Sequence, residues 1–292
     1  MTGRIADRSL AQSSIHNLQW NLSLIADLRN QASTAKNLNK PSDSPVGIGE
    51  SLALRSSLSR NTQLSTNIDD AEGWLGTAGS TLGAVGTQLR TINSLVLQAA
   101  NAGTDQNGRN AIANQIDQLR QSILGLANTQ YGNRPLFGGT ASGNIAYDPS
   151  GNYVGTAAPI ERTVAPGVQV QVNVDGDSVF GPPANSLFTT LARISDAVRA
   201  GTSLNALGTQ LKTQTQNVLT QQALTGSTYA RIRTITTQNA TNASTTQQNL
   251  SNVEDVDLAQ VLMNLHAQET TYQSALAAAA MAMQPSLAAF LQ

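Results

Sequence analysis

The chain has 292 residues, no cysteine, a formal net charge of −1 and a pI near 6.1. This balanced charge offers no basic surface for nucleic acid or an anionic membrane, so we expect neither as a partner. The lack of cysteine excludes disulfides, thiol nucleophiles and cysteine-ligated zinc, and the longest apolar stretch, residues 276–283, is far shorter than the roughly 20 residues that span a bilayer.

The N-terminal segment, residues 1–40, is predicted to be a long helix. Its first ten residues lack the apolar core of a signal peptide, so we expect any export to use no cleaved signal. Further on, apolar residues recur three or four positions apart, which places them on one stripe of a helix. The residues of this N-terminal stripe are Ile15, Leu18, Leu22 and Ile25.

A hinge is predicted after this helix. Ser44 suits the N-cap of the next helix, and the proline that follows it suits the first helical position, where its missing N–H costs nothing. The motif consists of Lys40, Pro41, Ser42, Asp43, Ser44 and Pro45.

Helical spacing continues over residues 82–99 and 112–126, with a break at residues 101–107 where we expect the chain to turn back. Five glycines recur at intervals of three or four, just before and within the first of these stripes. Each would weaken a helix by about 0.5–1 kcal/mol relative to alanine. Either another helix approaches closely there, or this stretch is a weak, adjustable helix. The glycines are Gly73, Gly76, Gly79, Gly83 and Gly86.

Residues 131–186 are predicted to form a small β insert. Six of the nine prolines fall within it, and valines alternate at positions 168, 170, 172 and 174 as in a half-buried strand. Residues 148–151 and 175–176 carry turn signals suited to hairpins.

Helical spacing resumes over residues 187–198 and is clearest near the C-terminus. The residues of this C-terminal stripe are Leu258, Leu262, Leu265, Tyr272, Leu276 and Met283. Two such terminal helices are marginal in water by themselves, because an amphipathic helix is stabilised mainly by packing. We therefore predict that both stripes are assembly interfaces stabilised by neighbouring copies.

Charge by segment indicates how the two ends meet. Residues 1–40 hold five basic and two acidic residues, whereas residues 250–292 hold four acidic residues and no Lys or Arg. A chain that runs out and back, with the β insert at its far tip, would lay the end helices side by side and antiparallel. Opposite charge favours this pairing, although exposed ion pairs contribute only about 0–1 kcal/mol each. We predict a mainly α fold with a β insert, in which long antiparallel helices from both termini form a coiled coil beside a small central β domain.

The predicted division has five parts. The terminal coiled-coil helices are residues 1–40 and 250–292. The helical rod domain has an N-terminal part, residues 41–130, and a C-terminal part, residues 187–249, and residues 131–186 form the β-rich outer domain.

The sequence offers little support for a catalytic site. The only histidines, His16 and His266, lie inside helical apolar patterns, and a Ser-His-Asp site would need one of them beside a suitable serine. Glu254, Asp255 and Asp257 precede the last helix, where acidic residues favour the N-terminal end of the helix dipole. We expect no enzyme activity, no metal site and no cofactor.

Several motifs are similar to those of the hook–filament junction proteins of the flagellin superfamily. They are the hinge motif and residues 67–75, 98–101, 126–130, 135–140 and 285–291, and the resemblance covers roughly residues 4–140 and 250–292. Flagellin itself shares the Gln-Ala-Ala-Asn region at 98–101 and the paired terminal helices, so a short flagellin forming the filament is the alternative. The hinge motif and the Leu-Phe-Gly-Gly-Thr run at 136–140 favour the junction family.

This resemblance implies an extracellular structural protein of the bacterial flagellum, exported unfolded through the flagellar type III apparatus and needed for motility. It would connect the hook, through hook-associated protein 1, to the flagellin filament. The resemblance also implies a ring of about eleven copies with the terminal helices as an inner tube. An export chaperone is expected to cover Leu258, Leu262, Leu265 and Tyr272 before secretion.

Overall fold

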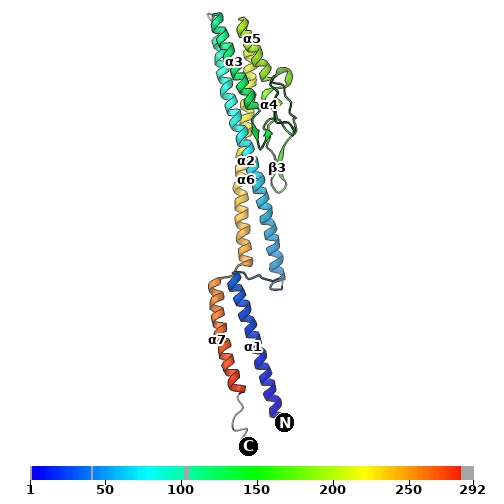
Figure 1. Ribbon diagram of the computed structural model, residues 1–292, viewed down its shortest axis with the longest axis vertical. Helices are drawn as coiled ribbons and strands as arrows, with labels where there is room; N and C mark the ends of the chain where they lie inside the picture. The colour runs from blue at the N-terminus through cyan, green and yellow to red at the C-terminus, as the bar shows by residue number, and fades with distance from the viewer. Residues whose placement is uncertain (1, 41, 102–104, 284–292) are drawn as a thin grey trace. The chain divides into compact units, whose positions relative to one another are not determined.

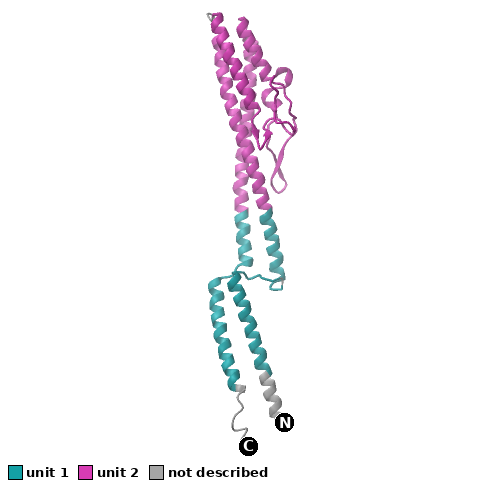
Figure 2. Cartoon of the chain, viewed as in Figure 1, with its two compact units in different colours: residues 1–59, 243–292 teal, residues 60–242 magenta. Residues whose placement is uncertain are grey.

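The computed structural model describes residues 2–40, 42–101 and 105–283 (Figure 1). The chain divides into two compact units, which we call unit 1 (residues 1–59 and 243–292) and unit 2 (residues 60–242; Figure 2). Two long helices, α2 (Pro45–Ala100) and α6 (Asn205–Glu254), contribute residues to both units. The mainly helical fold with a small β part is confirmed, and the five-part division stays a prediction.

In unit 1, helices α1 (Thr2–Thr34) and α7 (Leu258–Met283) lie side by side and run antiparallel (Figure 1). Ile25 of α1 and Val261 and Ala279 of α7 are buried. Arg29 Nη2 lies 2.6 Å from Glu269 Oε1, so a predicted contact between a basic N-terminal and an acidic C-terminal segment is present. The Arg29 side chain is 65% exposed, so packing contributes more than this ion pair.

Unit 2 is built around the buried stripe of α2, whose residues Leu82, Val85, Leu89 and Ile92 are fully buried. Helix α3 (Gln106–Ala127) packs against α5 (Leu187–Ala200). The chain turns back between α2 and α3 as predicted, and the Asp105 carboxylate caps α3 by accepting a hydrogen bond from the N–H of Gly108 at 2.8 Å.

The β insert holds two antiparallel two-stranded sheets. Strand β1 (Gln130–Tyr131) pairs with β2 (Arg134–Pro135), and β3 (Glu161–Ala165) pairs with β4 (Val168–Gln171). The insert continues with the short helix α4 (Gly176–Phe180) and the 3-10 helix η1 (Pro183–Asn185). A cluster of rings fills its interior, formed by the buried Phe137, Tyr147 and Phe180, the partly buried Tyr153, and the buried Phe188 of α5.

Two details of the insert differ from the prediction. The strand ends at Gln171, so only the first half of the alternating valine run is in β4. Asp175 does not form a hairpin turn, because its side chain accepts a hydrogen bond from the N–H of Ser178 and so caps α4. By contrast, the turn predicted at residues 148–151 is present, with the Asp148 carboxylate accepting from the N–H groups of Ser150 and Asn152.

The glycine row of α2 faces α6. A Cβ added to Gly76, Gly79 or Gly86 would lie 3.6–3.9 Å from side chains of α6, which is ordinary van der Waals contact. Of the two explanations that the sequence left open, a second helix packed on the glycine row is the one observed, although these three positions leave room for a methyl group. Gly73 differs, because its added Cβ would overlap the hydroxyl of Tyr131, whose ring packs edge-on against Trp74.

This contrast predicts opposite effects for two matched substitutions. Gly73→Ala should lower the free energy of unfolding by about 1–3 kcal/mol, because the methyl group must displace a packed ring. Gly79→Ala should raise it by about 0.5–1 kcal/mol, because alanine fits and favours the helix. Urea unfolding of the two purified variants measures both changes, and a stabilising Gly73→Ala would contradict the packing described here.

Candidate assembly site at the hinge and the terminal helices

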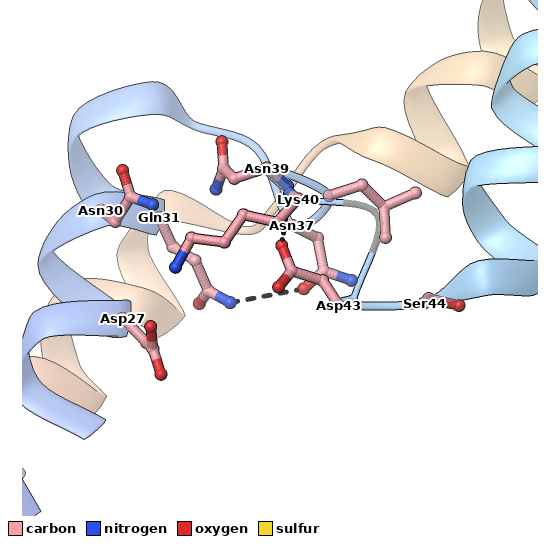
Figure 3. A pocket seen from close by; sticks show the side chains of 9 residues that line it. Asp27, Asn30, Gln31, Asn37, Asn39, Lys40, Asp43 and Ser44 are labelled. Carbon is pink, nitrogen blue, oxygen red and sulfur yellow. Dashed lines mark hydrogen bonds between the residues drawn. The ribbon is translucent and has the colours of Figure 1, made fainter. Parts of the chain in front are cut away.

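The hinge is a closed turn between α1 and α2 (Figure 3). The Asp43 carboxylate accepts hydrogen bonds from the N–H groups of Asn39 at 3.0 Å and Lys40 at 2.7 Å, and the Asp43 N–H donates to the Lys40 carbonyl at 3.0 Å. Ser44 Oγ accepts from the N–H of Gly47 at 3.1 Å and α2 begins at Pro45, so the predicted N-cap is confirmed. Ser42 is exposed, and Pro41 lies outside the described residues.

A polar hollow of about 250 Å³ opens beside this turn, between side chains of α1 and of the loop. Figure 3 shows Asp27, Asn30 and Gln31 on the α1 side, with Asn37 and Lys40 among the loop residues facing them. In residues 2–40, 42–101 and 105–283, no group of three or more His, Cys, Asp or Glu side chains could hold a metal ion. The hollow is lined mainly by polar side chains of α1 and of the hinge loop.

The chain passes the hinge twice, once between α1 and α2 and once between α6 and α7, and we call these two links the hinge crossings. They are joined by backbone hydrogen bonds. The N–H of Asn37 donates to the carbonyl of Glu254 at 2.6 Å, and the N–H of Val256 donates to the carbonyl of Ala35 at 3.2 Å. Lys36 and Asp255 thus form an isolated antiparallel bridge. The link from α1 to α2 and the link from α6 to α7 are consequently fixed to each other.

Glu254 lies at the centre of this junction, with a side chain only 4% exposed. Arg55 binds its carboxylate in a fork, with Nε 2.7 Å from Oε1 and Nη2 2.8 Å from Oε2. Ser51 Oγ donates to Oε1, and Lys36 Nζ donates to Oε2 at 3.1 Å. We call Lys36, Ser51, Arg55 and Glu254 the Glu254 cluster.

The charges of this cluster stabilise one another. Hydrogen bonds from Arg55, with those from Ser51 and Lys36, lower the pKa of Glu254 to about 2 despite its burial. Lys36 Nζ also lies 2.6 Å from Asp255 Oδ1, and these hydrogen bonds raise the pKa of Lys36 and lower that of Asp255. All the charged groups of the cluster stay ionised near neutral pH.

Sequence reasoning missed this cluster. Of the three acidic residues expected at the start of the last helix, only Asp257 caps α7, accepting from the N–H groups of Ala259 at 3.0 Å and Gln260 at 3.2 Å. Glu254 instead ends α6. No local pattern could have identified it, because its partners come from segments about 200 positions earlier in the sequence.

The predicted stripes lie on α1 and α7 but are only partly buried. Ile25 is buried, and Leu18, Leu265 and Tyr272 are partly buried. The remaining described members are between 42% and 53% exposed, and they are Ile15, Leu22, Leu258, Leu262 and Leu276. The Met283 side chain lies outside the described residues. A single chain therefore leaves much of both stripes in water.

A shallow groove runs between the two terminal helices. It is lined by Leu22 and Ile25 of α1 and by Tyr272 and Leu276 of α7, with the Arg29–Glu269 ion pair beside them. Val261 and Ala279 are the buried hydrophobic side chains in the described part of α7, and neither was among the predicted interface residues. Leu258 and Leu262 do not line this groove and are 42–43% exposed on a flank of α7.

No helix in the described part of the chain has the length and apolar character needed to cross a membrane.

Comparisons with known proteins agree with this architecture. Residues 5–142 match the family model of the bacterial flagellin N-terminal helical region. The chain is 24% identical over 271 residues to flagellar hook-associated protein 3 of Escherichia coli K12, an alignment that covers 84% of this chain and 86% of that protein. A flagellin of Clostridium tyrobutyricum is 23% identical over 137 residues, which is 47% of this chain and 36% of that protein.

Solved structures show the same fold. FlgL of Bacillus cereus superposes with a TM-score of 0.60 at 24% identity, covering 68% of this chain and 99% of that chain. The resemblance predicted from the sequence is therefore confirmed: this chain is similar in sequence and fold to flagellar hook-associated protein 3 of the flagellin superfamily.

Proposed function

We propose that this chain is a structural protein of the bacterial flagellum that joins the hook, through hook-associated protein 1, to the flagellin filament, and that it catalyses no reaction. The observation that carries the proposal is the extent of the similarity. The alignment with hook-associated protein 3 spans most of both proteins, whereas that with a flagellin spans about half of this chain.

The exposed stripes support assembly into a ring. Covering a half-exposed leucine with a neighbouring helix stabilises the assembly by about 25 cal/mol per Å² of apolar surface removed from water. Leu258, Leu262 and Leu276 lie on one helix and recur in every copy, so the gain is multiplied around a closed ring. We propose that about eleven copies close the ring, with α1 and α7 lining its inner tube.

The same stripe suits a partner before assembly. Leu258 and Leu262 are accessible in the free chain, and Leu265 and Tyr272 lie farther along the same helix. We propose that an export chaperone covers these four residues until the chain passes unfolded through the flagellar type III apparatus to the outside of the cell.

The second candidate is a short flagellin that forms the filament itself. It is favoured by the match of residues 5–142 to the flagellin N-terminal helical region.

Labelling of intact flagella distinguishes the two candidates. An epitope inserted between Ser142 and Gly143 lies in an exposed loop of the β insert and leaves the terminal helices unchanged. Immunogold electron microscopy should then show one band of label where hook and filament meet, on cells that still swim. Label along the whole filament would identify a flagellin, and unlabelled flagella on cells that export the tagged chain would contradict both candidates.

A further inference from the structure

The Glu254 cluster connects parts of the chain that are far apart in sequence. Lys36 follows α1, Ser51 and Arg55 belong to the first turns of α2, and Glu254 lies where α6 passes into α7. All four residues belong to unit 1. The Glu254 carboxylate, at the end of α6, therefore contacts the other hinge crossing through Lys36 and the helix α2 through Ser51 and Arg55.

The chemistry of the cluster makes the carboxylate irreplaceable. Each partner presents hydrogen-bond donors: the guanidinium, the ammonium and, toward Glu254, the Ser51 hydroxyl. A side chain with a donor of its own would meet a donor there, and an apolar one would leave Ser51, itself only 5% exposed, without this acceptor. The Arg55 fork adds directional specificity that a single point charge lacks.

The side-chain hydrogen bonds of Glu254 and the backbone hydrogen bonds of the hinge lie next to one another. The N–H of Asn37 reaches the carbonyl of Glu254 itself, and Val256 reaches Ala35, so the backbone bonds lie within two residues of the side-chain bonds. Opening the side-chain contacts exposes the backbone bonds to water. The hinge should thus open as one cooperative unit.

We propose that Glu254 is a positioning residue that locks the hinge, holding the end of α1 and the start of α7 together against the first turns of α2. While the hydrogen bonds of Glu254 are formed, the terminal helices are ordered as a pair. When these bonds break, the end of α1 and the start of α7 lose their order together. This inference concerns the free chain and does not rest on the proposed function.

Hydrogen exchange on the full-length chain tests the proposal. Glu254→Gln keeps the size of the side chain and removes its charge, and Glu269→Gln removes the same charge from the exposed pair with Arg29. In Glu254→Gln, amides at the end of α1, of Asn37 and Val256, and at the start of α7 should exchange at least about tenfold faster than in the wild type, a factor equivalent to about 1.4 kcal/mol. In Glu269→Gln the same amides should change less than about threefold.

Two further readouts keep the test decisive. Amides of α3 and α5 in unit 2 should keep their protection in Glu254→Gln, which shows that the variant is folded. Arg55→Lys, which retains the charge but not the fork, should accelerate the hinge amides to an intermediate degree. Unchanged hinge protection in Glu254→Gln, or hinge amides that exchange at unprotected rates in the wild type, would overturn the proposal.

Discussion

Leu262→Asp is expected to abolish incorporation of the chain into flagella while leaving the isolated chain folded. Leu262 is 42% exposed in the single chain, so a carboxylate there stays hydrated. The substitution should therefore change the free energy of unfolding of the single chain only slightly. In the proposed ring the same position is covered by a neighbouring helix. Burying an unpaired carboxylate costs several kcal/mol, and the cost recurs in every copy.

The matched control is Leu262→Met, which keeps an apolar side chain of similar size and should assemble normally. Swimming in soft agar and electron microscopy of the cells measure incorporation, and circular dichroism of the purified variants measures folding. Normal filaments on cells that carry only the Asp variant would show that this flank of α7 is not an assembly surface.

Acid is expected to weaken unit 1 through Glu254. The pKa of Glu254 in the folded chain is about 2, below its ordinary value of 4.5, so the folded state favours the ionised form. The corresponding stability is present in full above pH 4.5 and is lost as the pH falls toward 2. A change of this size corresponds to about 3 kcal/mol for the buried carboxylate. The lowered pKa of Asp255 acts in the same direction.

Thermal unfolding of the wild type and of Glu254→Gln across this range isolates the contribution of Glu254. The wild type should melt at a higher temperature at pH 7, and the difference should shrink as the pH falls from about 4.5 to about 2. At alkaline pH a separate loss is expected above 10.5, because Lys36 has a raised pKa and its stabilising charge disappears there. A difference that does not change between pH 7 and pH 2 would exclude an ionised Glu254 as its source.

The helices were predictable because their signals are local. Apolar spacing placed the α2, α3, α5 and α7 helices, and the Ser44 cap fixed the start of α2 to the residue. The antiparallel pairing of α1 and α7 followed from an out-and-back path of the chain together with opposite segment charges, although the buried side chains of α7, Val261 and Ala279, were not among the predicted interface residues. Helical spacing identifies a stripe, but the partner decides which edge of it is covered.

The parts that escaped prediction depend on distant contacts. The glycine row could indicate a close helix or a weak one until α6 was seen to pack against it. Asp175 has the same local chemistry in a turn as in a helix cap, and tertiary context selected the cap. The Glu254 cluster joins positions 36, 51, 55 and 254, and no local spacing reports such a contact.

Deletion of the gene, with cells and culture medium examined together, tests the central claim most directly. If this chain joins hook and filament, the mutant should carry hooks without filaments, and flagellin monomers should accumulate in the medium because they are exported but cannot attach. Electron microscopy shows the first result, and gel electrophoresis of the medium shows the second. Intact motile filaments on the mutant, or bare hooks with no other flagellin in the medium, would contradict the junction role.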